Sequence, residues 1–241
     1  MSNGRYELPN KERYQLIKES GFDGVLLWWS EGFGRNYYLD APEMAREAGL
    51  FIENIHTPVQ NQDHIWQDNL DGEALFDCYL KCPTMVVHLP NEKKPYNQLG
   101  LDRIKRMADK AEQLGIKVAL ENLQNLSNIS YMLEQVDSPS IGFCYDCGHH
   151  YHYYPDKDLL SMYGSWLMAL HLHDDNGSYG MHGLSLDGTI DWTIAMKNIE
   201  KTGYTGPTAI EAMYWDYEDL TAREFLHRAY ESGKKLETLR N

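Results

Sequence analysis

The stretch Ile141-Gly-Phe-Cys-Tyr-Asp-Cys-Gly-His-His150 indicates the fold more clearly than any other part of the chain. Its first half is apolar and predicts a strand that is buried on both faces. The strand ends at Asp146, and His149 follows three residues later. A parallel strand carries its last side chains to the rim of its sheet, and Gly148 permits a sharp turn, so both side chains should face one point. This spacing is compatible with a pair of metal ligands, although alone it also fits two unrelated rim residues.

Strand and helix patterns alternate along all 241 residues. The strand-like runs begin near residues 22, 50, 84, 116, 140, 168 and 207. Their intervals are about 31 residues, the size of one β-α unit. Helices are expected between them, at 9–20, 42–48, 73–81, 101–114, 129–136, 156–163, 192–201 and 222–239. Such alternation is typical of parallel strands with right-handed crossovers. We therefore predict one α/β domain over residues 1–241, a (β/α)8 barrel.

The first strand of this barrel is the weakest part of the prediction. Only Gly4-Arg-Tyr-Glu-Leu8 precedes the first helix, so the first strand should be short or degenerate, or the barrel incomplete there. Asn10 is the expected N-cap of that helix. The helix with the clearest apolar spacing should end at Gly115.

The charge of the chain excludes several classes of partner. Lysine and arginine total 22 against 36 aspartates and glutamates, a net charge of −14. A surface this acidic repels phosphate backbones, so we do not expect a nucleic-acid partner. No apolar run approaches the roughly 18 residues of a membrane span, and no secretory signal pattern is present. We expect a cytoplasmic protein without membrane contact, and self-association into a homo-oligomer is compatible with the sequence.

The four cysteines are Cys78, Cys82, Cys144 and Cys147. Cys144 and Cys147 form a C-x-x-C pair that could bind zinc or be redox-active. We favour structural thiols, because the pair lies on either side of Asp146 at a predicted strand, where alternate residues face opposite sides.

Side chains that bind metals end six of the seven strand-like runs; the run through Trp28 and Trp29 lacks one. Active sites of (β/α)8 barrels lie at the carboxyl ends of the strands, so these side chains should meet at one rim. Any one of them could simply face water, but all of them together indicate a shared site. They are His56, His88, Glu121, Asp146, His171 with His173, and Glu211.

The polar loop 174–188 carries His182, which could reach the rim beside His149 or remain in solvent. Asp174 could orient His173 through its second ring nitrogen. Imidazole and carboxylate ligands without a thiolate favour Zn²⁺ or Mn²⁺, with Co²⁺, Fe²⁺ or Mg²⁺ as alternatives. The spacing does not distinguish among these divalent ions.

Through these residues and the motifs around them, the sequence resembles the xylose isomerase-like TIM barrel superfamily. This superfamily includes sugar phosphate isomerases and epimerases and the metal-dependent AP endonucleases. As a set, the matching motifs are specific for the superfamily but not for one reaction. They are Gly21-Phe-Asp-Gly-Val, Asn54-Ile-His-Thr-Pro58, Val86-Val-His88, Val118-Ala-Leu-Glu-Asn122, Gly142-Phe-Cys-Tyr-Asp-Cys-Gly-His149, Leu170-His-Leu-His-Asp174, Leu186-Asp-Gly-Thr-Ile-Asp-Trp192 and Ala209-Ile-Glu211.

The resemblance also implies which residues bind metal. The ion shared by most members would be held by Glu121, Asp146, His171 and Glu211. Further zinc ions of the endonuclease branch are bound at positions that match His56, His88, His149 and His182. The Asp-x-His pattern of the family is Gly180-Met-His182 in this chain. One expected carboxylate is therefore absent, which argues against a full trinuclear site.

The reaction that we predict is isomerisation or epimerisation of a keto-sugar or related polyol. The metal would polarise a carbonyl and the neighbouring hydroxyl, and Glu121 and Glu211 would move the proton between them as base and acid. The small-molecule substrate would lie against aromatic and imidazole side chains, each of which also fits ordinary rim packing. These are Trp28, Trp29, Trp66, His149 and His173.

Other reactions fit part of the pattern. Zinc-dependent phosphodiester cleavage of the AP endonuclease type is favoured by the additional histidines and disfavoured by the acidic charge and by Gly180. A sugar dehydratase or lyase could use the same metal site. A barrel that only binds its ligand would not require both glutamates.

Overall fold

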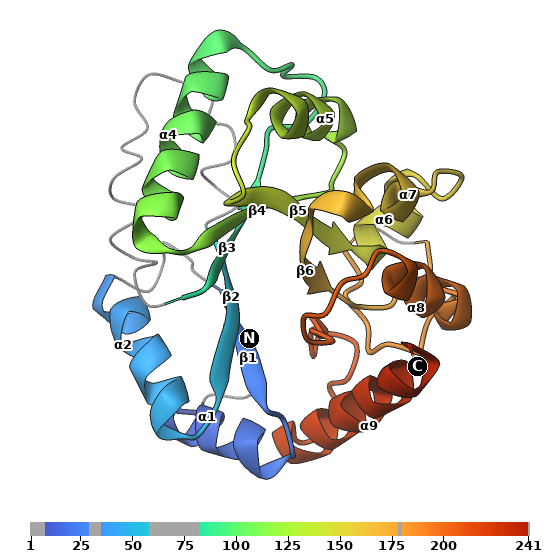
Figure 1. Cartoon of the computed structure of the whole chain (residues 1–241). Helices are drawn as coiled ribbons and strands as arrows, with labels where there is room; N and C mark the ends of the chain where they lie inside the picture. The colour runs from blue at the N-terminus through green and yellow to red at the C-terminus, as the bar shows by residue number, and fades with distance from the viewer. Residues whose placement is uncertain (1–7, 29–34, 58–81, 178–179, 241) are drawn as a thin grey trace.

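The computed structural model describes residues 8–28, 35–57, 82–177 and 180–240. Within them, six parallel strands form one sheet in which the spatial order follows the chain. The sheet curls into a ring, and the helices lie outside it (Figure 1). The fold is therefore a single-domain α/β TIM-barrel-like fold, as the sequence predicted. The strands are β1 (Gly24–Trp28), β2 (Phe51–His56), β3 (Thr84–His88), β4 (Lys117–Glu121), β5 (Ile141–Asp146) and β6 (Leu167–His171).

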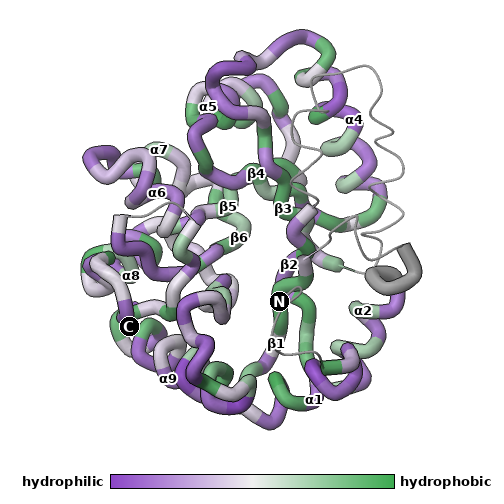
Figure 2. The backbone as a smooth tube through the Cα atoms, turned by 180° about the vertical axis from the view of Figure 1, so that it is seen from behind, coloured by the Kyte–Doolittle hydropathy of each residue, from purple (hydrophilic) through white to green (hydrophobic). Residues whose placement is uncertain are grey.

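The helices confirm the alternating pattern and its apolar spacing. In α4, the buried residues recur every three or four positions, and Figure 2 shows hydrophilic and hydrophobic segments alternating along it. Asn97 caps its first turn, and Gly115 ends it at φ 68°, a conformation that glycine adopts without strain. The helices are α1 (Asn10–Glu19), α2 (Arg35–Glu47), α4 (Gln98–Leu114), α5 (Leu126–Gln135), α6 (Cys147–Tyr153), α7 (Leu159–Tyr163), α8 (Trp192–Lys201) and α9 (Ala222–Arg240).

Three local predictions were wrong. Asn10 is the first residue of α1 and not its N-cap; Pro9 takes that position, and no side chain caps the helix. Helix α2 begins at Arg35, seven residues before the predicted start, and contains Pro42. Helix α6 was not predicted and begins directly after β5. The helix predicted at 73–81 lies outside the described residues.

The ring continues past β6 through one isolated bridge, between Leu172 and Ile210. The Leu172 amide donates to the Ala209 carbonyl at 2.9 Å, and the Glu211 amide donates to the Leu172 carbonyl at 2.9 Å. The strand predicted at 208–211 is thus reduced to this bridge. A cavity of about 330 Å³ lies between β1 and residues 207–213, with α1 and α9 in its wall. The first strand predicted at residues 4–8 falls almost entirely outside the described residues.

Small side chains fill the barrel directly below the strand ends. Val86, Ala119, Cys144 and Ala169 form a separate buried cluster, one from each of β3 to β6. The larger core lies between the sheet and the helices. Two residues further along each of these strands, the same face carries a polar side chain: His88, Glu121, Asp146 and His171. The small apolar side chains therefore form a packed layer directly beneath the polar rim. Strand pairing aligns His88 with Glu121 and Asp146 with His171.

Candidate active site

Glu121, the last residue of β4, lies at the centre of the rim and is 1% exposed. Its Oε2 is 3.3 Å from Nε2 of His56, 3.2 Å from Nε2 of His88 and 3.2 Å from Nδ1 of His171. Its Oε1 is 3.3 Å from Nδ1 of His149. The structure therefore brings four of the predicted ligands onto one carboxylate.

The four residues that the resemblance implied for the shared metal also come together. One ligand atom each of Glu121, Asp146, His171 and Glu211 lies within 4.8 Å of all the others. Nδ1 of His171 is 3.4 Å from Oε2 of Glu211. Two ligands bound about 2.1 Å from one tetrahedral metal ion are themselves about 3.4 Å apart. The grouping of these atoms is therefore compatible with one divalent cation between them.

Unsatisfied polar atoms support the same fit. Both carboxylate oxygens of Glu121 are buried and make no hydrogen bond of acceptable geometry within the described chain. The same holds for Nδ1 of His149, His171 and His182 and for Oε2 of Glu211. A buried polar atom that makes no hydrogen bond costs roughly 1–3 kcal/mol, so this cluster of carboxylate oxygens and imidazole nitrogens fits a divalent cation as a shared partner.

A second group of ligands lies on the β2 and β3 side of Glu121. Nε2 of His56 and Nε2 of His88 face each other at 3.0 Å. Nδ1 of His56 is 2.7 Å from the Thr57 carbonyl and 3.1 Å from Nε1 of Trp28. The Thr57 carbonyl requires a hydrogen on Nδ1, whereas the Trp28 N–H requires a lone pair there, so the two contacts cannot both be hydrogen bonds. Keeping the shorter contact places the hydrogen on Nδ1. That tautomer leaves the Nε2 lone pair for a cation.

His149, His173 and His182 form a third group. The His173 and His182 rings stack with their centroids 3.9 Å apart, and the loop thus returns His182 to the rim, near His149. His182 has φ 45°, which is unusual for a residue other than glycine. Gly180, where the family pattern has a carboxylate, contributes no ligand to this group. His173 completes it instead, although both oxygens of Asp146 contact its Nε2 at 3.1 Å.

Gly148 was predicted to permit a sharp turn after the strand, but the structure requires glycine there for a different reason. It lies inside α6 and does not have a positive φ, so it makes no left-handed turn. Asp146 caps this helix by accepting the His149 amide at 2.7 Å, which places both residues at the rim. A Cβ on Gly148 would lie 1.9 Å from Cε1 of His173. Glycine is therefore required because the His173 ring packs against the backbone.

The predicted role of Asp174 was wrong. Its carboxylate does not touch His173; Nδ1 of that ring is 3.3 Å from the Asp174 carbonyl. The carboxylate instead accepts hydrogen bonds from the Leu186 amide, the Ile190 amide and Nε1 of Trp192, at 2.8, 3.2 and 2.7 Å. Asp174 thus fixes the loop that leads into α8.

Asn122 is a site-supporting residue that sequence reasoning missed. Its side-chain oxygen accepts the Asp146 amide at 2.9 Å, and its nitrogen donates to the Asp146 carbonyl at 2.8 Å. The side chain therefore continues the β4–β5 pairing beyond Glu121 and holds the two carboxylates side by side. Its place in the motif Leu-Glu-Asn122 was the only signal in the sequence.

Of the three tryptophans predicted to contact substrate, the structure describes Trp28; it also shows a structural role for His150, to which no role was assigned above. Trp28 is partly buried and lies edge-on to His56, with ring centroids 5.8 Å apart. Trp29 and Trp66 lie outside the described residues, so their predicted substrate contacts stay predictions. His150 serves the fold, because Nδ1 lies 2.7 Å from the Tyr145 hydroxyl and Nε2 lies 2.8 Å from the Lys157 carbonyl.

The cysteines within the described residues are free and buried, as the prediction of structural thiols requires. Sγ of Cys147 lies 3.1 Å from the His173 carbonyl and 3.3 Å from the His173 amide nitrogen. Sγ of Cys144 lies within 4.8 Å of ligand atoms of Glu121 and His171. Burial raises the pKa of the Cys144 thiol above its usual value, so it stays protonated.

Opposite charges stabilise each other in this buried space. Burial alone would raise the pKa of Glu121, but the neighbouring His88 and His171 hold it well below its usual value. Burial alone would lower the pKa of His149, but the charges of Asp146 and Glu121 raise it to about 9. The pKa of His171 is likewise raised, against the effect of burial, by the neighbouring charges of Glu211 and Glu121. The Glu121 carboxylate thus stays ionised, and its charge can be balanced by protons on these imidazoles or by a bound cation.

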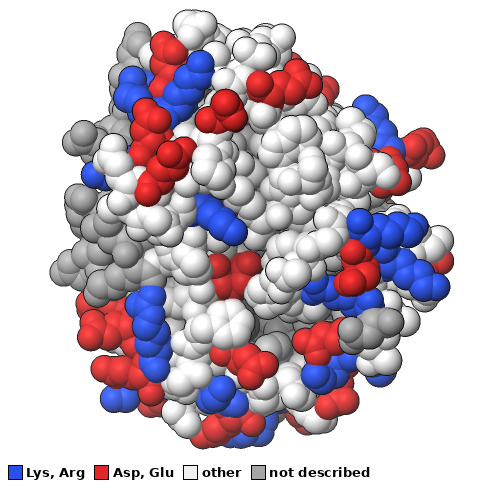
Figure 3. Space-filling model, in the orientation of Figure 1, with Lys and Arg blue, Asp and Glu red and all other residues white. Residues whose placement is uncertain are grey.

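Figure 3 shows acidic side-chain atoms inside a hollow near the centre of the face seen there. Basic and acidic groups alternate around the outer edge of this face (Figure 3). Within the described ranges, no helix is long and apolar enough to cross a membrane.

Comparison with known proteins identifies the family. The family model described as "Xylose isomerase-like TIM barrel" matches residues 14–240, so the chain belongs to this family.

Several of its relatives are sugar epimerases. Fructoselysine 3-epimerase of Shigella flexneri is 25% identical, and the match covers 93% of this chain and 94% of that protein. The structure of 3-keto-D-glucoside 4-epimerase from E. coli is similar with a TM-score of 0.71 at 16% identity, over 98% of this chain and 97% of that one. D-Allulose 3-epimerase from Methylomonas sp., in complex with D-allulose, gives a TM-score of 0.69 at 15% identity, over 96% and 90%. At these identities the two structures establish the shared fold.

Proposed function

We propose that the protein is a divalent-metal-dependent isomerase or epimerase that moves a proton next to the carbonyl of a keto-sugar or related polyol. One observation carries the proposal: two carboxylates from different parts of the ring meet at the same nitrogen of one imidazole. Nδ1 of His171 is 3.2 Å from Oε2 of Glu121 and 3.4 Å from Oε2 of Glu211. The sugar epimerases among the relatives support the same reaction class.

The two glutamates take the roles of base and acid. Held at the rim from different parts of the ring, they can approach a substrate carbon from different sides. One carboxylate would remove the carbon-bound proton, and the other, as a carboxylic acid, would return a proton to the opposite face and invert the centre. Return to the neighbouring carbon would instead exchange an aldose with a ketose. When bound, a divalent cation would polarise the carbonyl and hydroxyl oxygens of the substrate.

The protein's other groups would hold that arrangement. Glu121, Asp146, His171 and Glu211 would bind the cation, which we expect to be Zn²⁺ or Mn²⁺. Their burial, at most 7% exposed, excludes water from the ligands and strengthens each charge interaction. Trp28 and His149 would contact the substrate beside them.

A second candidate rests on the His56–His88 pair. Their 3.0 Å separation and their contacts with Glu121 fit a further cation, as phosphodiester cleavage by several zinc ions requires. Gly180 and the charge of −14 count against this alternative. A sugar dehydratase would use the first group of ligands alone.

Metal content and solvent-deuterium uptake test the proposal together. We expect about one Mn, Co or Zn per chain by elemental analysis, and incorporation of deuterium beside the carbonyl of at least one ketose in a panel of unphosphorylated and phosphorylated sugars. The Glu121→Gln, Glu211→Gln double variant should lose both. Two or three zinc ions per chain with cleavage of a phosphodiester would support the second candidate, and no metal under any loading condition would contradict both.

Metal binding should weaken as the pH falls. The pKa of His149 is raised to about 9, and the pKa of His171 is raised well above its usual value of 6.5. Both rings therefore carry a proton near neutral pH, and a cation must displace a proton from each of these nitrogens that it binds. Each displaced proton lowers the affinity about tenfold per pH unit. Competition with a chelator between pH 9 and pH 6 measures this slope, and an affinity independent of pH would show that the imidazoles are not ligands.

A further inference from the structure

Strand β2 contains an irregularity next to the site. Pairing with β1 aligns Val25 with Ile52 and Leu27 with Ile55, so β2 carries one extra residue between these pairs. Ile52 and Ile55 both belong to the core outside the sheet. The two residues between them, Glu53 and Asn54, do not belong to that core and are buried, at 9% and 0% exposure. A β-bulge interrupts the alternation of side chains between the two faces of a strand. It therefore allows two consecutive residues, Glu53 and Asn54, to lie away from the core outside the sheet.

Asn54 connects Glu53 to the site. Oδ1 of Asn54 lies 3.5 Å from Nε2 of His171. Nδ2 of Asn54 donates a hydrogen bond to Oε2 of Glu53. Among the described residues, the hydrogen bonds of Glu53 and Asn54 reach the candidate metal ligands at His171, and the proposed proton transfer uses neither of them.

The chain of contacts from Glu53 through Asn54 to His171 determines which ring nitrogen of His171 carries the hydrogen and which has a free lone pair. With Glu53 ionised and the amide turned over, Oδ1 of Asn54 would face Oε2 of Glu53, and two acceptors would oppose each other without a hydrogen. Burial raises the pKa of Glu53 to about 7, so this constraint on the amide applies above that pH. Glu53 therefore keeps the Asn54 oxygen towards His171, and an oxygen there requires a hydrogen on Nε2. That leaves Nδ1, the nitrogen nearest to Glu121 and Glu211, as the metal-binding atom of the neutral ring.

We propose that Glu53 and Asn54 are positioning residues that hold His171 in the tautomer and orientation in which Nδ1 binds the metal ion. The inference rests on the proposed function, because it assumes that His171 is a ligand. Hydrogen-bonded partners behind metal-binding histidines typically change metal affinity or activity about 10- to 100-fold when they are replaced.

Zinc affinity of the full-length protein tests this inference. In Asn54→Leu, which keeps the volume and removes the acceptor, we expect the dissociation constant, measured by chelator competition, to rise about 10- to 100-fold. In Glu53→Gln, which keeps the shape but no longer fixes the amide, we expect a rise of about threefold or more in the same direction. The double variant Glu53→Gln, Asn54→Asp again presents one oxygen to His171, while the amide at position 53 donates to the other oxygen of the same carboxylate, and it should restore most of the affinity.

A matched control separates positioning from stability. Asn128 is equally buried and binds the Pro90 carbonyl at 2.6 Å, away from the site. Asn128→Leu should lower the melting temperature and leave the zinc affinity unchanged. In the Co²⁺-loaded protein, the exchangeable Nε2 hydrogen of His171 should give a hyperfine-shifted proton signal that Asn54→Leu loses or broadens.

The outcomes distinguish the two proposals. If wild type binds zinc and both Asn54→Leu and Glu53→Gln bind it equally well, the positioning role is overturned and the metal site stands. If Asn54→Leu weakens binding no more than Asn128→Leu does, the effect is one of packing and the positioning role is again overturned. If wild type takes up no zinc, the proposed function fails, and this inference fails with it.

Discussion

Replacing Glu121 with glutamine should reduce turnover by about 10³-fold or more, and zinc affinity by at least about 10-fold. The reason is that this carboxylate serves several partners at once. It faces the nitrogens of His56, His88 and His171 at 3.2–3.3 Å, and it is the proposed base or acid. Glutamine keeps the volume but removes the charge, and its amide hydrogens would oppose the cation.

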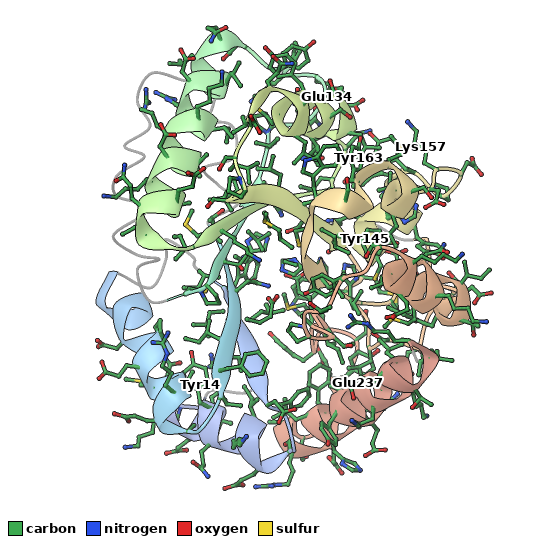
Figure 4. All side chains as sticks on the ribbon, viewed as in Figure 1. Tyr14, Glu134, Tyr145, Lys157, Tyr163 and Glu237 are labelled. Atoms are coloured by element: carbon green, nitrogen blue, oxygen red, sulfur yellow. The ribbon has the colours of Figure 1, made fainter. Side chains whose placement is uncertain are left out.

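The measurement is the rate of deuterium uptake by substrate, with metal content determined on the same sample. Glu134→Gln is the matched control: Glu134 is exposed on α5 and lies away from the ring (Figure 4), so both quantities should be unchanged. A Glu121→Gln variant that keeps its metal and at least a tenth of wild-type turnover would show that Glu121 neither binds the cation nor moves the proton.

Replacing Gly148 with alanine should destabilise the protein by about 3 kcal/mol or more, the upper range for an overpacked core site. The added Cβ would lie 1.9 Å from Cε1 and 2.5 Å from Nδ1 of the His173 ring. That ring cannot move aside without losing its contacts with Asp146, at 3.1 Å, and with the stacked His182. The variant should therefore also weaken the site.

Thermal unfolding measures the loss, which corresponds to a fall in melting temperature of about 6–12 °C for a domain of this size. Gly203→Ala is the control, because Gly203 has φ 77° and a Cβ there meets no atom within 4 Å. Its cost should be about 1 kcal/mol, from backbone strain alone. Equal effects of the two substitutions would show that the His173 ring does not pack as closely as described.

The strand ends could be predicted from sequence because one physical rule places them. Parallel strands deliver their last residues to a common rim, so His56, His88, Glu121, Asp146 and Glu211 could be grouped without knowing a single contact. The helix boundary at Gly115 was equally local, since glycine ends a helix where a left-handed residue is required.

The supporting contacts could not be predicted in this way. The bulge that turns Glu53 and Asn54 inward depends on the pairing of β2 with β1, which no periodicity in β2 reveals. Asp174 was assigned to its chain neighbour His173, whereas its partners are Leu186, Ile190 and Trp192, 12 to 18 residues away. Where a side chain forms its hydrogen bonds with residues distant in the sequence, the local sequence pattern does not identify those partners.

The group of site residues brings together parts of the chain that are far apart, from His56 on β2 to Glu211 beyond β6. No short fragment contains it, so a cation cannot organise the site until most of the barrel has formed. Contacts of such long range are completed late in folding. Metal should therefore leave the folding rate unchanged and slow unfolding, because it stabilises the native state more than the transition state. If the proposed metal site is correct, a cell that runs short of the metal would lose this protein through faster unfolding rather than through failed folding.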